Sequence, residues 1–408
     1  MPGPGAEFIG EEEKKEVLEV LESGNLFRYG SPDDPTFKAK VWTLEKRFAE
    51  YLGVKYCLAV NSGTSALLTA LSALGIGPGD EVIVPGYTFI ASISSIVYAR
   101  AVPVLCEIDD SLTADPKDIE SKITKRTRAI MPVHMLGNPC DMNPIMEIAK
   151  KHKLLVIEDA AQAGGASYHG RKVGSIGNIG IFSFNVFKTI SAGDGGAIAT
   201  NDQDLYARAF AFHDQGHSPL RQGVEVGKRP FIGLDFRMTE LTAAVLLAQL
   251  KKMDNIIKML REKKARFKKK ITGSGDFSFR KLNDPQGECA TLLTVIFNNK
   301  EKARSVAERL KTTTVDHSGW HVYNNMEQIL NQLTVTPEKC PFTCAYYKGK
   351  QAYRKSMLPQ TDDILARSIN ISIGVSDRGL GAGFGITATS DNQEIDRKAE
   401  EFSKAVRS

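Results

Sequence analysis

Several features that mark secreted, membrane or metal-binding proteins are missing from this sequence of 408 residues. Its six cysteines show no paired metal-ligand spacing with histidine, so no metal site is expected. Several of them lie in apolar runs, as is typical of reduced cysteines in the cytoplasm. The first residues lack the basic and apolar parts of a signal peptide, and no run of about 18 apolar residues is present to span a membrane. We therefore expect a soluble cytoplasmic protein.

An excess of one charge is also missing. The formal net charge is +5 and is spread along the chain. The nearest approach to a basic block, Lys263 to Lys270, is interpreted as the polar face of a long helix. Nucleic acid is therefore not an expected partner.

The sequence does contain a regular alternation of apolar strands with helices. A chain of this length exceeds one ordinary core, and its pattern changes in the last third, so we predict domains at 1–255 and 256–408. Strands that are apolar throughout indicate an α/β fold with a mostly parallel sheet covered on both faces, followed here by a smaller α+β domain. The predicted strands of the first domain are Tyr56–Val60, Glu81–Val84, Val102–Ile108, Ala129–Val133 and Leu154–Ile157, and a long helix is expected over Met238–Lys270.

The stretch from Ile179 to Thr200 carries the candidate reactive group. Two apolar runs enclose a single amine, Lys188, and a glycine-rich turn at 193–196. Burial of a lysine is costly because its ammonium loses hydration, and a desolvated amine has a lowered pKa that lets it form a Schiff base. On this stretch alone, a surface lysine on a loop between two strands explains the pattern equally well.

Three further segments fall at predicted strand ends, where ligands bind in parallel sheets. Asn61 to Ser65 forms a polar turn before a helix, which suits phosphate but is also typical of an ordinary helix cap. Glu158 and Asp159 end an apolar strand, with Gln162 one turn later. One of these acids can point into the crevice and hold a pyridine nitrogen protonated, or simply cap the next helix. Pro85 to Phe89 places aromatic rings where they stack on a flat ligand or pack in the core.

Together these segments describe a pyridoxal phosphate site with a phosphate cradle, a ring stack, a pyridinium partner and a lysine. At this point the chain resembles the DegT/DnrJ/EryC1/StrS family of sugar aminotransferases, which are fold-type I pyridoxal phosphate enzymes. The resemblance runs through residues 11–255 and is looser beyond them. Its motifs are SGTSAL at 62–67, GDEVIVPGYTFIAS at 79–92, VHMLG at 133–137, VIEDAAQA at 156–163, GIFSFNVFKTISAGDGGAIAT at 180–200 and GLDFRMTELTAAV at 233–245.

The resemblance implies a role for each matching residue. Lys188 would form the Schiff base with the cofactor and Asp159 would pair with its pyridine nitrogen, which makes both residues catalytic. It further implies a homodimer with shared active sites, in which the segment GLDFR of one subunit reaches the other's cofactor. The remaining cofactor contacts that it implies are Gln162 beside the ring hydroxyl, Phe89 on the ring face, and Gly63, Thr64 and Ser183 at the phosphate.

Two aspartates depart from the family's pattern. Asp194 stands where the family usually has Glu, a change of one methylene. Asp235 stands where the family usually has an Asn that contacts the partner subunit's cofactor phosphate. Two like charges about 4 Å apart repel by roughly 4 kcal/mol at an effective dielectric near 20. Asp235 must therefore be protonated, paired with a cation such as Arg237, or turned away.

The C-terminal third departs further, with DHSGWHVYNN at 316–325 in place of the family's usual His-Tyr-x-Pro-Leu-His motif. This segment, FRYG at 27–30 and FHDQGHSP at 212–219 resemble the branch that contains the 8-amino-3,8-dideoxy-octulosonate aminotransferase, which aminates the terminal aldehyde of an eight-carbon sugar acid. The candidate substrate-binding residues are Arg28, His217, His321 and Asn324.

The expected function is transfer of an amino group from glutamate or glutamine to a keto- or aldehydo-sugar, with pyridoxal 5'-phosphate as cofactor. Two alternatives stand beside it. A sugar dehydratase of this family has His at the lysine position, and Lys188 argues against that activity. A non-catalytic sensing protein of the same fold would not need Lys188 and Asp159, and only Asp235 favours it.

Overall fold

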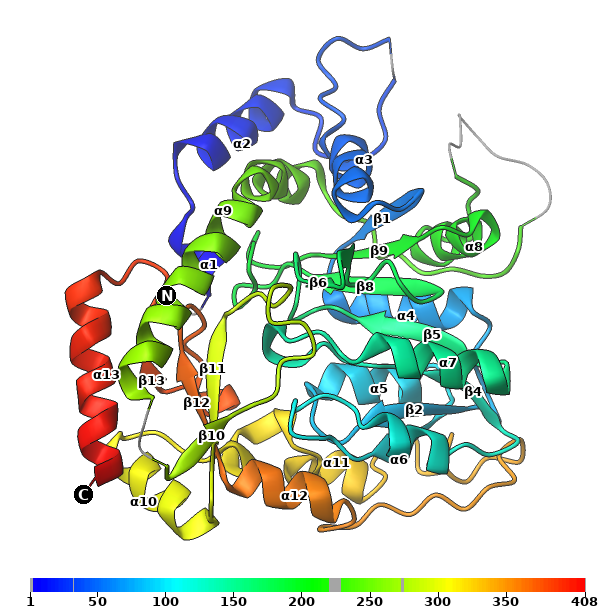
Figure 1. Ribbon diagram of the computed structural model, residues 1–408. Helices are drawn as coiled ribbons and strands as arrows, with labels where there is room; N and C mark the ends of the chain where they lie inside the picture. Colours follow the sequence, from blue (N-terminus) through cyan, green and yellow to red (C-terminus); the bar gives the residue numbers. More distant parts are fainter. Residues whose placement is uncertain (1–2, 32, 220–228, 273–274, 408) are drawn as a thin grey trace.

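The computed structural model describes residues 3–31, 33–219, 229–272 and 275–407 (Figure 1). Residues 56–200 contribute a sheet of seven strands, and residues 277–385 form a sheet of four strands. Helices pack around both sheets (Figure 1). The predicted α/β class, with a mostly parallel sheet and a smaller C-terminal domain, is confirmed.

The seven-stranded sheet has the order β1-β9-β8-β5-β4-β2-β3. Among these seven, β9 alone runs against the others: it pairs antiparallel with β1 and β8, and the neighbours from β8 to β3 pair in parallel. The strands span Tyr56–Val60 (β1), Glu81–Pro85 (β2), Val102–Cys106 (β3), Thr127–Ile130 (β4), Leu155–Asp159 (β5), Ile179–Ser183 (β8) and Gly196–Thr200 (β9).

Alternate side chains of one strand enter two different cores. In β1, Leu58 and Val60 pack in one core, and Cys57 and Ala59 pack in the other, on the opposite face. Because both faces are buried, the strands are apolar throughout, which is the pattern from which the sheet was predicted. The helices of the first face are α4 (Gly63–Ala73), α5 (Ile90–Tyr98) and α8 (Gln203–His213), and those of the second face include α3 (Lys40–Leu52), α6 (Pro116–Ser121) and α7 (Met142–His152).

The four-stranded sheet belongs to the C-terminal region and has the order β10-β11-β12-β13. β11 pairs antiparallel with both neighbours, and β12 and β13 pair in parallel. The helices α10 (Lys300–Arg309) and α13 (Asn392–Arg407) accompany this sheet. The strands span Phe277–Phe279 (β10), Leu292–Phe297 (β11), Ser368–Ser372 (β12) and Phe384–Gly385 (β13).

A single helix, α9, joins the two sheets (Figure 1). It spans Glu240–Ile271 and is capped by Thr239, whose side-chain oxygen accepts a hydrogen bond from the Thr242 N–H. It contacts α2 (Glu11–Ser23) and α3 on one side of the molecule and α13 and β11 on the other. The predicted domain boundary after residue 255 lies inside this helix and stays a prediction.

Candidate active site

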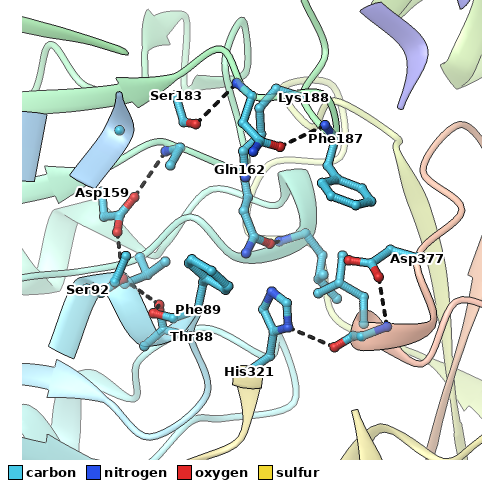
Figure 2. A pocket seen from close by; sticks show the side chains of 18 of the residues that line it. Thr88, Phe89, Ser92, Asp159, Gln162, Ser183, Phe187, Lys188, His321 and Asp377 are labelled. Carbon is cyan, nitrogen blue, oxygen red and sulfur yellow. Dashed lines mark hydrogen bonds between the residues drawn. The ribbon is translucent and has the colours of Figure 1, made fainter. Parts of the chain in front are cut away.

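A cavity of about 650 Å³ lies at the carboxyl edge of the large sheet, beyond the ends of β5 and β8 (Figure 2). The segments around Thr291 and Gly379 of the C-terminal region form its other side. The structure therefore brings together segments that are far apart in the sequence. The predicted site residues that line the cavity are Gly63, Thr64, Phe89, Asp159, Gln162, Ser183, Lys188 and His321.

Lys188 lies in the turn after β8, where its backbone N–H donates to the Asn185 carbonyl oxygen at 3.0 Å. Burial lowers the pKa of its amine, and the charges of Asp159 and Asp377 oppose that shift. Within the described part of the chain, no carboxylate forms an ion pair with this amine. A desolvated amine without an ion-pair partner is populated in its neutral, nucleophilic form.

Asp159 is the last residue of β5 and lines the cavity (Figure 2). Its Oδ2 accepts from the Ser92 hydroxyl at 2.7 Å, and its Oδ1 accepts from the Ala161 N–H at 3.1 Å. Because the single Ser92 proton goes to Asp159, the Thr88 hydroxyl must be the donor in its 2.7 Å contact with Ser92. Burial raises the pKa of Asp159, and the bonds from Ser92 and Ala161 oppose that rise by stabilising the carboxylate.

The neighbouring acid, Glu158, points the other way and is enclosed by donors. It accepts from the N–H groups of Gly174, Ile176 and Gly177 at 2.6 to 2.8 Å, and lies 3.1 Å from His134 Nε2. Burial alone would raise the pKa of Glu158, but the bond to His134 and the backbone donors lower it overall. Of the two acids that were predicted to share the strand end, Asp159 is the one that lines the cavity.

The turn between β1 and α4 forms a corner suited to an anion. Ser62 Oγ accepts from the Ser65 N–H at 3.1 Å, and the first-turn N–H groups of a helix have no partners within the helix. A Cβ at Gly63 would lie 2.7 Å from the Ser183 Cβ, so glycine is needed for this close approach. Backbone amides and the hydroxyls of Thr64 and Ser183 thus border one part of the cavity.

Phe89 and His321 stand next to each other in the cavity wall (Figure 2). Their ring centroids are 5.2 Å apart and their planes are inclined at 45°. The His321 Nδ1 donates to the Gly379 carbonyl oxygen at 2.8 Å, which leaves Nε2 as an acceptor. Burial lowers the pKa of His321 to about 4, so the ring is neutral near pH 7. Gln162 completes the cluster and accepts from the Leu136 N–H at 3.2 Å.

The lining residues from the C-terminal region that were not predicted include Trp320 and Asp377. Asp377 accepts from the Gly379 N–H at 2.7 Å and so caps the turn η5 (Arg378–Leu380). The sequence Asp-x-Gly is a turn signal, but a local pattern does not reveal that the turn faces a cavity. Asp194, noted for its departure from the family's Glu, lines the cavity as well.

Asp235 does not line the cavity of its own chain and is half exposed. Its Oδ2 lies 2.5 Å from the Arg237 Nη2, and Arg237 also pairs with Asp214. Of the three expected arrangements for Asp235, the structure has the pairing with Arg237. Two carboxylates therefore share this one guanidinium.

The structure does not bring the other predicted substrate residues to the cavity. Arg28 has no exposed surface, because its guanidinium is bound to Glu45 at 3.0 Å and lies against the Trp42 ring. Asn324 donates to Asp362 at 2.7 Å, outside the cavity lining. His217 follows α8, where its N–H donates to the Asp214 carbonyl oxygen at 2.8 Å. Of the four candidates, His321 alone is a lining residue.

The described residues contain neither a membrane-spanning helix nor a cluster of metal ligands. No helix among them is both long and apolar enough to cross a membrane. No group of three or more His, Cys, Asp or Glu side chains in residues 3–31, 33–219, 229–272 and 275–407 is placed to hold a metal ion.

The fold identifies the class of protein, because an aminotransferase of known structure has the same fold. It resembles the X-ray structure of the aminotransferase from Psychrobacter cryohalolentis with a TM-score of 0.75 and 29% identity, over 100% of this chain and 98% of that chain. The chain belongs to the DegT/DnrJ/EryC1/StrS aminotransferase family, which it matches over residues 7–376. The predicted family is thereby confirmed.

Curated relatives give the same family at higher identity. The chain is 51% identical over 211 residues to the GDP-perosamine synthase of Caulobacter vibrioides (strain ATCC 19089 / CIP 103742 / CB 15), and this match covers 52% of this chain and 56% of the relative. It is 44% identical over 260 residues to the GDP-perosamine synthase of Escherichia coli O157:H7, over 64% of this chain and 68% of the relative. The matches thus span between about half and two thirds of these relatives.

Proposed function

We propose that this protein is a sugar aminotransferase that uses pyridoxal 5'-phosphate. The observation that carries the proposal is that two buried groups line one cavity: the Lys188 amine, which forms no ion pair within the described part of the chain, and the Asp159 carboxylate. Family membership and the GDP-perosamine synthases among the relatives support the choice of a sugar as substrate.

The residues of the cavity fit the cofactor. Gly63 allows Ser183 to approach closely, so that the start of α4 and the side chains of Thr64 and Ser183 border one corner of the cavity, and this corner suits the phosphate. Asp159 accepts two hydrogen bonds as a carboxylate, so it can also accept one from a protonated ring nitrogen. Phe89 offers a face to the ring, and Gln162 lies beside them. When bound, the cofactor supplies the electron sink for transamination.

The chain's own residues then bind the reactants and move protons. Lys188 anchors the cofactor with its amine, and in each half-reaction the released amine moves the proton of the reacting carbon. Burial lowers the pKa of this amine, which favours its taking the proton as a base and returning it as an acid. Neutral His321 presents Nε2 as an acceptor for a donor group of the substrate.

We propose glutamate or glutamine as the amino donor and a nucleotide-linked keto-sugar as the acceptor. The relatives named GDP-perosamine synthase support a nucleotide-linked sugar. The segments at 27–30, 212–219 and 316–325 favour instead the terminal aldehyde of an eight-carbon sugar acid. A panel that contains both sugars distinguishes them.

We further propose a homodimer in the cytoplasm, with a shared active site. Large apolar side chains are about half exposed on α2 and the following segment, among them Leu18, Leu21 and Phe27. Phe27 lies under the Arg237 guanidinium at 5.2 Å, so this apolar surface continues to Asp235. A second copy that covered it would bring Asp235 to an interface. A fully active monomer in sedimentation at micromolar concentration would contradict the shared site.

The activity is tested by single turnover. The purified protein is loaded with the amine form of the cofactor, mixed with each sugar of the panel, and followed by absorbance and by mass spectrometry of the product. We expect one sugar to gain an amino group, and borohydride treatment of the resting enzyme to fix the cofactor on Lys188. A dehydrated product would indicate the dehydratase alternative. Cofactor binding without turnover of any sugar in the panel would favour the sensing alternative.

A further inference from the structure

The N-terminal segment Gly3–Phe8, which we call the N-terminal clamp, lies directly against the turn that carries Lys188. It includes the short helix α1 (Pro4–Glu7), which lies beside α9 (Figure 1). The Gly5 N–H donates to the Lys188 carbonyl oxygen at 3.3 Å. Pro4, Gly5 and Ala6 are buried, although they lie close to the chain terminus. This contact is therefore to the backbone of the residue that the proposed function makes the anchor of the cofactor.

The approach of the clamp is so close that two positions require glycine. A Cβ at Gly5 would lie 2.6 Å from the Ser191 N and 2.7 Å from the Ile190 Cα. A Cβ at Gly3 would lie 2.6 Å from the Phe187 carbonyl carbon. The obstructing atoms are backbone atoms, which cannot turn aside as a flexible side chain can. The clamp therefore fixes the turn on both sides of Lys188.

Gln249 of α9 ties the clamp and the turn together. Its Oε1 accepts from the Ser191 N–H at 3.3 Å, and its Nε2 donates to Glu13 Oε1 at 2.9 Å and approaches the Phe8 carbonyl oxygen at 3.5 Å. Gln249 has no exposed surface. A buried amide that uses both ends in this way holds its neighbours in one arrangement, because each lost bond would leave a buried polar group unsatisfied.

The clamp also reaches the C-terminal region. Glu7 Oε2 accepts from both the N–H and the hydroxyl of Thr389 at 3.0 Å. Pro4 packs near Gly374, just after β12, where a Cβ on Gly374 would come within 3.4 Å of the proline ring. Gly374 immediately precedes Val375, a lining residue of the cavity. The same short segment thus contacts the lysine turn and the part of the small domain that faces it.

We propose that the N-terminal clamp is a positioning element, which holds the backbone of Lys188 in place while its side chain is released from the cofactor and returned to it. A proton transfer depends on the distance between the donor and acceptor atoms, and a misplacement of about 1 Å can cost on the order of a hundredfold in rate. None of residues 3–8 lines the cavity, so the clamp would act through the backbone of Lys188. Its effect on turnover depends on the proposed function, but its effect on the lysine turn does not.

The test compares Gly5→Ala with Gly10→Ala in the full chain. Gly10 lies five residues beyond Gly5, has an extended backbone, and has nothing within 4 Å of an added Cβ, so it is the matched control. The first measurement is amide hydrogen exchange of residues 185–191 in the cofactor-free protein. We expect exchange there to rise at least about tenfold in Gly5→Ala and to stay at the wild-type rate in Gly10→Ala. The second is turnover, where kcat should fall on the order of tenfold while KM changes little.

Gln249→Leu is the second variant, in case Gly5→Ala does not fold. It removes the bridge without adding a Cβ, and we expect the same two changes. A folded variant with wild-type exchange at 185–191 overturns the proposal, even if its melting temperature is lower, because that result would make the segment a support of the fold only. Faster exchange at 185–191 with an unchanged kcat overturns the positioning role. Faster exchange in a protein whose wild type has no transaminase activity would support the clamp and contradict the proposed function.

Discussion

The two faces at the end of β5 carry adjacent acids with opposite surroundings. Glu158 is enclosed by three backbone N–H groups and His134, so the hydrogen-bonding capacity of its carboxylate is largely used within the fold. Asp159 receives two donors and faces the cavity. Both are buried acids in one strand. The comparison teaches that burial of a charge does not by itself mark a functional residue, and that unused bonding capacity toward a cavity is the better criterion.

Two buried lysines repeat the comparison. Lys264 of α9 forms an ion pair with Glu288 at 2.5 Å, and burial lowers the pKa of its amine to about 8. Lys188 is also desolvated, but it lines the cavity without an ion-pair partner in the described chain. A paired lysine fastens α9 to the small domain, and an unpaired one is available to a ligand.

The largest effect is expected at Lys188. Lys188→Ala should lower transamination by at least about a thousandfold, because it removes both the anchor and the group that moves the proton. Lys264→Ala is the control, which should lose stability and keep turnover in its folded fraction. The measurements are single-turnover rates and the absorbance of the bound cofactor. An unchanged cofactor spectrum in Lys188→Ala would mean that another lysine is the anchor.

Substitution of Glu158 should lower mainly stability, and substitution of Asp159 should lower mainly activity. Glu158→Gln replaces one carboxylate oxygen by an N–H₂ group that would face two donors, either Ile176 and Gly177 or Gly174 and His134, and we expect the free energy of unfolding to fall by about 3 kcal/mol. Asp159→Asn should change stability by less than about 1 kcal/mol and lower kcat by on the order of a hundredfold. Urea unfolding measures the stability of both variants, and steady-state kinetics measure their kcat. A reversed outcome would break the distinction drawn between the two faces.

His321 is a further buried titratable side chain. Its Nδ1 donates a hydrogen bond within the fold, and its Nε2 is available as an acceptor. Its pKa is about 4 in the folded protein and 6.5 as the ordinary value, so the unfolded chain binds the proton more tightly between these values. Stability should therefore be complete above pH 6.5 and fall by about 3 kcal/mol as the pH drops to 4. Urea unfolding of wild type and His321→Gln at several pH values isolates this contribution. Parallel curves for the two proteins would contradict it.

The Ser92 hydroxyl donates a hydrogen bond to Asp159 and so stabilises its carboxylate. Ser92→Ala should raise the pKa of Asp159 further and weaken cofactor binding by about tenfold, which is the cost of one hydrogen bond to a charged group. Ser92→Thr keeps the hydroxyl and should restore affinity. Ser95→Ala on the same helix, whose hydroxyl bonds to the Ser92 carbonyl oxygen, is the control. Equal affinities of the alanine variants in cofactor titrations would remove Ser92 from the site.

The smallest effect is expected at Asp235, which is half exposed and paired with Arg237. Asp235→Asn weakens that pair, so cofactor affinity should fall by no more than about threefold, as is usual for an exposed ion pair. Cofactor titrations of the wild type and of Asp235→Asn at equal ionic strength measure this difference in affinity. Tighter binding in Asp235→Asn would show instead that the carboxylate opposes the cofactor phosphate.

Local patterns predicted the parts of the molecule that depend on local physics. The strand Tyr56–Val60 and the helix around Glu240–Ile271 follow from apolar runs and apolar spacing. The lysine and the strand-end acid were recognisable because those residue types are unusual after buried strands. The burial of Arg28 could not be predicted from local patterns, because it depends on an ion pair with Glu45, which is itself buried by the packing of α3. Asp377 shows the same, because the small domain must fold onto the large sheet before that turn has a cavity to face.

The continuity of α9 limits how this protein can be divided or recombined. A helix of 32 residues is about 48 Å long at 1.5 Å per residue, and its buried apolar side chains belong to one hydrophobic core that extends from α3 to the small sheet and α13. A chimera joined after residue 255 would take half of its helix from each parent and would have to match the apolar surfaces of both. Junctions before Thr239 or after Ile271 leave the helix whole. A small domain can therefore be exchanged with the whole of α9 or without it, but not with half of it.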